Sequence, residues 1–156
     1  MKRGVDYLKE LGFGEGNKPR VLLVEDNDEL RVAYKHSLEW AGFEVVAVDD
    51  GLKFVKTLKD QKALGKRFHV VLSDTDMPEM FGDEACKKAL EKRLLDDNVL
   101  VLAMSDDIHN DYYWNGIAHH TGFYDKNRVS DMGSQVMSHY YNFVKGESSM
   151  WRMRMF

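Results

Sequence analysis

The sequence predicts an α/β domain built on a parallel sheet with helices on both faces. Short apolar runs alternate with amphipathic segments of helical spacing five times along the chain. The runs are almost continuously apolar and rich in β-branched residues, which is typical of strands buried on both faces. Strict strand–helix alternation implies right-handed crossovers between parallel strands. A length of 156 residues fits one such domain.

The expected strands are the five apolar runs, taken in chain order. They cover residues 21–24, 43–48, 68–72, 99–104 and 122–124. The first four have the length and composition of buried strands, and the fifth is a short Gly-Phe-Tyr run. We therefore expect one central sheet whose strands follow each other through helical crossovers.

The expected helices lie between these runs and after the last one. Each has apolar side chains at a spacing of three or four residues, which places them on one face. These residues are Leu30, Ala33, Tyr34, Leu38 and Ala41 in the first, Leu52, Val55 and Leu58 in the second, Cys86, Ala89, Leu90 and Leu94 in the third, and Met132, Val136, Tyr140 and Val144 in the fifth. Gly42 is expected to cap the first helix. The fourth segment, about residues 109–120, has a weaker pattern.

The two ends of the chain fall outside the five units. We expect an N-terminal extension over residues 1–18, the main domain over residues 19–146 and a C-terminal tail over residues 147–156. The extension is expected to hold one short amphipathic turn with Val5, Leu8 and Leu11, and the glycines that follow it at positions 12, 14 and 16 suggest a flexible lead-in. The tail alternates apolar and basic residues, and it is too short to be an output domain. The tail has three alternative interpretations: an added edge strand, a partner-docking peptide or a membrane-surface contact.

Composition excludes several classes of protein. Lys and Arg number 22 against 26 Asp and Glu, and the net charge of −4 argues against a general nucleic-acid binder. The single cysteine, Cys86, excludes a disulfide framework and is expected to be buried and inert. No apolar run reaches the roughly 20 residues of a membrane span, and the first residues lack the apolar stretch of a signal peptide. We expect a cytoplasmic protein without nucleic-acid or membrane partners.

Polar residues follow four of the apolar runs. They are Glu25-Asp26, Asp74-Thr75-Asp76, Ser105-Asp106-Asp107 and Asp125-Lys126. Ligands of open α/β sheets bind outside the carboxyl ends of the strands, so these groups are expected around one shallow site. Several carboxylates, a hydroxyl and an ammonium group form an oxygen-rich site of the kind that suits Mg²⁺.

These residues resemble those of response-regulator receiver domains, and the resemblance extends over about residues 19–146. Residues 74–82 match the family's D-x-x-M-P-x-M-x-G run, which is the most specific motif in the chain. The acid pair Glu25-Asp26, Ser105 and Lys126 also fall where the family has its acid pair, its Thr or Ser and its lysine. The resemblance is to stand-alone, chemotaxis-type receivers. It implies a three-layer flavodoxin-like (βα)5 fold with a five-stranded parallel sheet in the order 2-1-3-4-5.

The resemblance also implies a role for each site residue. Asp74 would be the phosphoacceptor, with Ser105 and Lys126 completing the catalytic set. The Mg²⁺ ligands would be Glu25, Asp26, Asp74 and the backbone carbonyl of Asp76. Ser105 and Phe123 would form the switch, with Ser105 moving toward the phosphoryl group and Phe123 filling the space behind it. Tyr112, Tyr113 and Trp114 would lie beside the surface used for partners, although packing against a terminal extension is an equal alternative.

The function that follows is that of a single-domain response regulator in a two-component phosphorelay. It would accept phosphate from a histidine kinase or phosphotransfer protein and signal by binding a downstream protein or a second copy of itself. Its own chemistry would be at most self-phosphorylation from a phosphodonor and autodephosphorylation. A pseudo-receiver that is never phosphorylated is the alternative, favoured by Asp106 and Asn127, where the family has a small residue and a proline. A small D-x-D phosphatase using Asp74 and Asp76 is a third, although that family carries its motif on the first strand.

Overall fold

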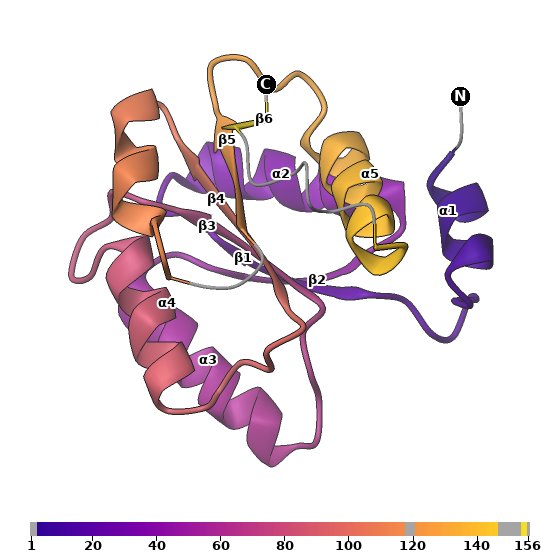
Figure 1. Ribbon diagram of the computed structural model, residues 1–156, viewed down its shortest axis with the longest axis horizontal. Coiled ribbons are helices and arrows are strands. Elements are labelled where there is room, and N and C mark those ends of the chain that lie inside the picture. Colours follow the sequence, from indigo (N-terminus) through magenta and orange to yellow (C-terminus); the bar gives the residue numbers. More distant parts are fainter. Residues whose placement is uncertain (1–2, 118–120, 147–153, 156) are drawn as a thin grey trace.

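The computed structural model describes residues 3–117, 121–146 and 154–155, and its centre is one parallel sheet (Figure 1). The strands are β1 (Arg20–Val24), β2 (Glu44–Val48), β3 (Val70–Asp74), β4 (Leu100–Ser105), β5 (Thr121–Asp125) and β6 (Arg154–Met155). Their order in the sheet is β2-β1-β3-β4-β5-β6. The first five strands therefore have the predicted order 2-1-3-4-5, and the flavodoxin-like fold class is confirmed.

Helices cover both faces of the sheet, as the buried strands required. The helices are α1 (Gly4–Glu10), α2 (Asp28–Ala41), α3 (Gly51–Ala63), α4 (Gly82–Glu91), the 3-10 helix η1 (Ile108–Trp114) and α5 (Met132–Val144). One hydrophobic core contains residues of α1, α2 and α5, and a second contains residues of α3, α4 and η1. Figure 1 shows the same division into two helical layers.

Side-chain caps explain where three of these helices begin. The side chains of Asn27, Asp50 and Asp131 accept hydrogen bonds from backbone N–H groups in the first turns of α2, α3 and α5. Gly42 ends α2 with φ at 116°, a conformation that favours glycine, so the predicted cap is confirmed. The buried face of α3 contains Phe54, whereas Leu52, which was expected on that face, is 51% exposed.

Strand register brings the ends of the strands to one edge of the sheet. Asp74 is the last residue of β3, and it pairs with Met104 on β4. Ser105, the next residue of β4, pairs with Asp125 on β5. The polar residues that follow the strands are thus placed side by side by the parallel pairing itself.

The fourth helical segment differs from the prediction. It is a 3-10 helix that begins after Asp107, whose side chain accepts the N–H of His109, and it ends at Trp114. Gly116, at φ 73°, turns the chain immediately afterwards. The predicted segment extended to residue 120, but residues 118–120 lie outside the described part of the chain. A short 3-10 helix, rather than a full α-helix, therefore follows β4.

The amphipathic turn expected in the N-terminal extension forms as α1, and it packs against the domain rather than being part of a flexible lead-in. Leu8 is only 8% exposed and belongs to the core formed with α2 and α5. The ring of Tyr7 lies 4.8 Å from that of Tyr141 on α5. The glycines do not interrupt this packing, because Gly12 turns the chain at φ 85° after the helix has ended. Burial of the apolar side chains of α1 therefore fixes this part of the extension.

The C-terminal tail contributes a strand in its described part. Arg154 and Met155 pair in parallel with Phe123 and Tyr124, which makes β6 an edge strand next to β5. Of the three alternatives for the tail, residues 154–155 thus adopt the edge strand, whereas residues 147–153 and 156 lie outside the described part. Among the described helices, none combines the length and hydrophobicity needed to cross a membrane.

Candidate functional site

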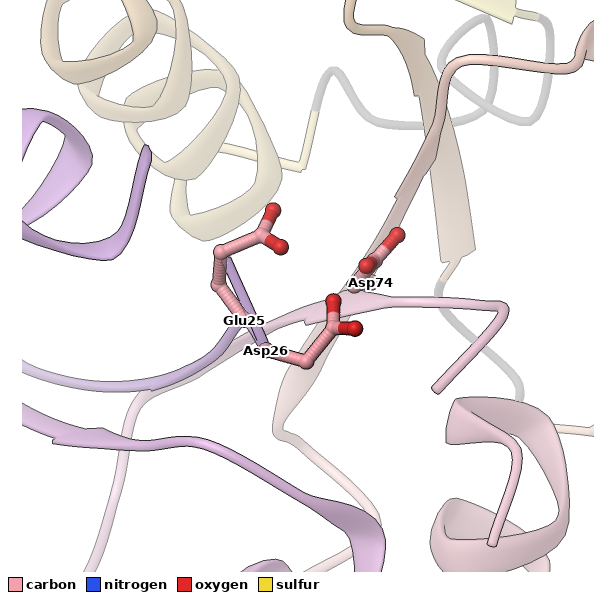
Figure 2. A group of neighbouring side chains, drawn as sticks. All are labelled: Glu25, Asp26 and Asp74. Carbon is pink, nitrogen blue, oxygen red and sulfur yellow. The ribbon is translucent and has the colours of Figure 1, made fainter. Parts of the chain in front are cut away.

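Three carboxyl groups meet where β1 and β3 end. Glu25 and Asp26 directly follow β1, and Asp74 is the last residue of β3. One oxygen from each lies within 4.8 Å of the others. Glu25 and Asp74 are buried, while Asp26 is exposed. Figure 2 shows the three side chains gathered at this edge of the sheet.

Lys126, which follows β5, lies among these carboxylates. Its Nζ is 2.5 Å from Oε1 of Glu25 and 3.1 Å from Oδ1 of Asp74. Burial lowers the pKa of Lys126, but the charges of Asp74 and Glu25 outweigh burial and the net shift is upward. Burial raises the pKa of Asp74, and the carboxylate of Glu25 raises it further against the opposing effect of Lys126. The site is therefore a cluster in which the ammonium group of Lys126 pairs with the two buried carboxyl groups, while the third, that of Asp26, is exposed.

The backbone after β3 holds Asp74 in place. The N–H of Thr75 donates a hydrogen bond of 2.9 Å to Oδ1 of Asp74. The N–H of Gly82, the first residue of α4, donates 2.8 Å to the carbonyl of Thr75. A Cβ on Gly82 would lie 2.0 Å from the carbonyl oxygen of Asp74. The final glycine of the D-x-x-M-P-x-M-x-G run is thus required by the close approach of α4 to the acceptor strand.

Ser105 lies at the end of β4 with its hydroxyl bound on the η1 side. Its Oγ accepts hydrogen bonds from the N–H of Asp107 at 3.0 Å and from Nδ2 of Asn110 at 2.9 Å. A hydroxyl has two acceptor positions and one donor hydrogen. Both acceptor positions are used here, so the hydrogen of Ser105 is the group it has to offer a ligand.

The two remaining predicted site residues, Phe123 and Asp76, differ in exposure, and one further residue, Tyr34, lies near the acidic cluster. Phe123 is 5% exposed and packs in the core that contains α3, α4 and η1. Asp76 is exposed, two residues beyond Asp74. Tyr34 of α2 was predicted only as a helix-face residue, but it lies near enough for Glu25 and Asp74 to add to the effect of burial, which raises its pKa.

Asn127 and Asp106 mark the two departures from the receiver pattern. The backbone N–H of Asn127 donates 2.9 Å to Oδ1 of Asp125, a hydrogen bond that proline cannot make. Its side chain donates a hydrogen bond of 2.9 Å to the carbonyl of Asp106. The side chain of Asp106 is exposed and does not belong to the acidic cluster. The loop after Lys126 is therefore held by hydrogen bonds of Asn127 that a proline at this position could not make in full.

One contact next to the site, between Thr75 and Trp114, could not be predicted from the sequence. Trp114 was expected in a cluster beside a partner surface, but it is 4% exposed, and its Nε1 donates 2.9 Å to Oγ1 of Thr75. The two residues are 39 positions apart. Neither hydrophobic periodicity nor a local motif reports a polar contact over such a separation.

The donor set of the site fits a magnesium ion. All three side chains offer carboxylate oxygens, the ligands that Mg²⁺ prefers. The exposed position of Asp26 leaves room for the waters that this ion usually keeps. Three carboxylates against one ammonium group also leave an excess of negative charge that a divalent cation would offset.

The fold and the site together define a doubly wound, flavodoxin-like protein with an acidic, lysine-containing site at the carboxyl edge of its sheet. Comparison with known families narrows this class. Residues 21–121 match the response regulator receiver domain, and the chain belongs to this family of two-component signalling domains.

Individual relatives agree with this assignment. The chain is 35% identical to the response regulator receiver protein CpdR of Brucella abortus over 72 residues, which cover 46% of this chain and 56% of CpdR. It is 30% identical to the two-component response regulator ORR5 of Oryza sativa subsp. japonica over 97 residues, or 62% of this chain and 69% of ORR5. Chemotaxis response regulator CheY4 of Vibrio cholerae has the same fold, with a TM-score of 0.66 and 24% identity over 80% of this chain and 99% of that one.

Proposed function

We propose that this chain is a single-domain response regulator that accepts a phosphoryl group on Asp74 in a Mg²⁺-dependent reaction and signals through protein–protein interaction. The observation that carries the proposal is the position of Asp74, whose carboxylate lies 3.1 Å from Nζ of Lys126 and within the acidic cluster. Residues 19–146 would form the receiver domain, residues 1–18 its N-terminal extension and residues 147–156 its tail. A cytoplasmic location would suit such a partner-binding regulator.

The proposed reaction is an in-line phosphoryl transfer. A carboxylate oxygen of Asp74 forms the new P–O bond, and the bond from phosphorus to the donor's leaving group breaks, so that the electron pair of that bond leaves with the donor. An anionic nucleophile and an anionic phosphoryl group repel each other, and the ammonium of Lys126 offsets this repulsion. The hydroxyl of Ser105 would donate its hydrogen to a phosphoryl oxygen. Glu25, Asp26, Asp74 and the carbonyl of Asp76 would hold Mg²⁺, which stabilises the negative charge of the transferred group.

Output would use the switch residues at the same edge. Ser105 would move toward the phosphoryl group and Phe123 would fill the space behind it, which would change the surface around η1, β5 and α5. The burial of both side chains, at 1% and 5% exposure, supports this route because buried groups repack together rather than independently. The phosphoryl donor would be a histidine kinase or a phosphotransfer protein, and the recipient of the signal a downstream protein or a second copy of the chain.

The pseudo-receiver is the second candidate, and the backbone hydrogen bond of Asn127, which the family's proline could not make, is the observation that favours it. Against it, the carboxylate of Asp106 is exposed and stays outside the acidic cluster, so it leaves Asp74 and Lys126 paired. The D-x-D phosphatase has no such support, because Asp74 lies on the third strand of a chain that matches the receiver family.

Beryllofluoride, which mimics a phosphoryl group, tests the proposal. ¹⁹F NMR of the whole chain should show a protein-bound signal that requires Mg²⁺ and is absent from Asp74→Asn. Asp76→Asn is the matched control, since it removes a neighbouring exposed carboxylate and should keep the bound signal. A bound signal that persists in Asp74→Asn would refute Asp74 as the acceptor, and its absence from the wild type would favour the pseudo-receiver.

A further inference from the structure

Thr75 connects the acceptor carboxylate to three elements of the fold. It is fully buried, and each of its polar atoms is hydrogen-bonded. Its N–H donates to Oδ1 of Asp74 and its carbonyl accepts the N–H of Gly82. Its hydroxyl donates a hydrogen bond of 3.1 Å to the carbonyl of Met104 and accepts one of 2.9 Å from the indole N–H of Trp114. A displacement of Thr75 therefore cannot leave β4, α4 and η1 all unchanged.

Trp114 is the buried residue of η1. It is 4% exposed, whereas Tyr112 and Tyr113, which directly precede it, are 72% and 47% exposed. An indole N–H can only donate, and a buried donor that loses its acceptor is costly. Trp114 is therefore expected to move when Thr75 moves. The other residues of η1 must then move as well, because they belong to the same short helix.

The exposed aromatic side chains next to Trp114 form one surface. We call Phe81, Tyr112 and Tyr113 the aromatic surface. The ring centroids of Phe81 and Tyr113 are 6.4 Å apart and those of Tyr112 and Tyr113 are 6.0 Å apart, with the rings nearly perpendicular. Phe81 directly precedes Gly82, so both sides of this surface are linked to Thr75. In Figure 1, η1 is the orange helix that lies next to α4 in the same helical layer.

Phosphorylation would change the acceptor to which Thr75 is bound. Oδ1 of Asp74 now belongs to a carboxylate and accepts from both Thr75 and Lys126. Once one oxygen of Asp74 is bonded to phosphorus in an acyl phosphate, the carboxyl group no longer carries a negative charge. Hydrogen bonds to charged acceptors are about twice as strong as those to neutral ones. The bond that holds the N–H of Thr75 would thus weaken when the site is modified.

We propose that Trp114 is a positioning residue that couples the state of Asp74, through the hydroxyl of Thr75, to the aromatic surface. The inference rests on the proposed function and adds to it a route that does not pass through Ser105 and Phe123. Coupling of two sites is reciprocal, so a change that breaks the link must alter ligand binding at Asp74 as well as the response of the surface. A residue with a purely structural role would change stability alone.

The test uses the whole chain labelled with 3-fluorotyrosine, with the resonances of Tyr112 and Tyr113 assigned by single Tyr→Phe changes. Saturating beryllofluoride and Mg²⁺ should shift these resonances in the wild type. Trp114→Phe keeps the ring and removes the N–H, and Thr75→Val keeps the shape and removes the hydroxyl. Both should lose the shift, and both should change the beryllofluoride dissociation constant by about 5-fold or more, the lower end of typical coupling. The double variant should change it no further than either single one.

Two further variants separate coupling from packing. Thr75→Ser keeps the hydroxyl and should retain the shift, which makes the test independent of whether Trp114→Phe folds. Trp40→Phe changes an exposed side chain, 93% accessible on α2 in the other helical layer, and should alter nothing. The inference is overturned if the wild-type resonances do not respond to bound ligand, or if Trp114→Phe and Thr75→Val respond fully. A wild type that binds no beryllofluoride would instead overturn the proposed function, and the inference with it.

Discussion

Asn127 and Asp106, the two residues that depart from the receiver pattern, are hydrogen-bonded to each other. Nδ2 of Asn127 donates 2.9 Å to the carbonyl oxygen of Asp106. This bond joins the loop after β5 to the loop after β4, and Lys126 and Ser105 precede the two residues directly. The two departures therefore form one local arrangement that holds the loops of the lysine and the hydroxyl together.

Replacing Asn127 with proline should destabilise the fold. The change removes the N–H that donates to the buried carboxylate of Asp125, in addition to the side-chain bond. A buried acceptor that loses its donor costs about 1–3 kcal/mol of unfolding free energy. Urea unfolding would measure this loss. Asn127→Ala is the matched variant because it keeps the N–H and should cost less than about 1 kcal/mol. Equal stability of the proline variant and the wild type would contradict this account of the loop.

Gly82→Ala should disrupt the acceptor strand. The added Cβ would lie 2.0 Å from the carbonyl oxygen of Asp74 and 2.7 Å from Oγ of Ser73, so the backbone of α4 must move away. Overpacking of this kind costs about 1–3 kcal/mol, which exceeds the roughly 1 kcal/mol that alanine gains over glycine in a helix. Thermal melting should show a clear loss. Gly16→Ala, where no atom lies within 4 Å of the added Cβ, should melt like the wild type.

Magnesium should stabilise the protein against unfolding. Glu25, Asp26 and Asp74 repel one another when no cation lies between them, and a ligand of the native state stabilises it by about 2.7 kcal/mol at a hundred times its dissociation constant. Melting curves with and without millimolar Mg²⁺ should differ, and Asp26→Asn should reduce the difference. Superimposable wild-type curves would argue against the metal site.

Mild acid should destabilise the fold through His139. This side chain is fully buried on α5, and burial lowers its pKa to about 4, against about 6.5 in an unfolded chain. The unfolded state therefore binds more protons between these two values, so stability is present above pH 6.5 and is lost as the pH falls toward 4. One such histidine costs about 2 kcal/mol at pH 5.

Urea unfolding at pH 7 and pH 5 would measure this effect. In His139→Gln the unfolding free energy should differ less between the two pH values than it does in the wild type, whatever the stability of the variant at pH 7. Part of the difference should remain, because burial and the nearby Arg67 and Arg20 lower the pKa of His69 to about 4 as well. An unchanged difference in the variant would assign the acid sensitivity to other groups.

The sequence predicted the sheet better than the segments around it. Strands buried on both faces are continuous apolar runs, and each predicted run overlaps the strand that forms. The fourth segment was harder to predict, because η1 is held by two side-chain hydrogen bonds rather than by an amphipathic pattern. Asn110 donates to Ser105, five residues earlier, and Trp114 donates to Thr75, which is 39 positions away. The amphipathic spacing of α1 was visible in the sequence, but its packing was not, since Leu8 finds its partners in helices far along the chain.

The site was predicted as a set of strand ends, and the structure brings Glu25, Asp26, Asp74 and Lys126 together there. Its chemical roles came from the resemblance to receivers and remain predictions. Thr75 carried no signal of its own, because a threonine after a strand is unremarkable until its hydroxyl is seen between Met104 and Trp114.

The most direct test of the central claim is the intact mass of the chain after incubation with acetyl phosphate and Mg²⁺. We predict one added phosphoryl group that is stable in acid, labile in base, and absent from Asp74→Asn. If the wild type stays unmodified and Asp106→Ala becomes modified, the carboxylate of Asp106 obstructs an otherwise intact acceptor site. A wild type and an Asp106→Ala variant that both stay unmodified would contradict the claim that Asp74 is a phosphoacceptor.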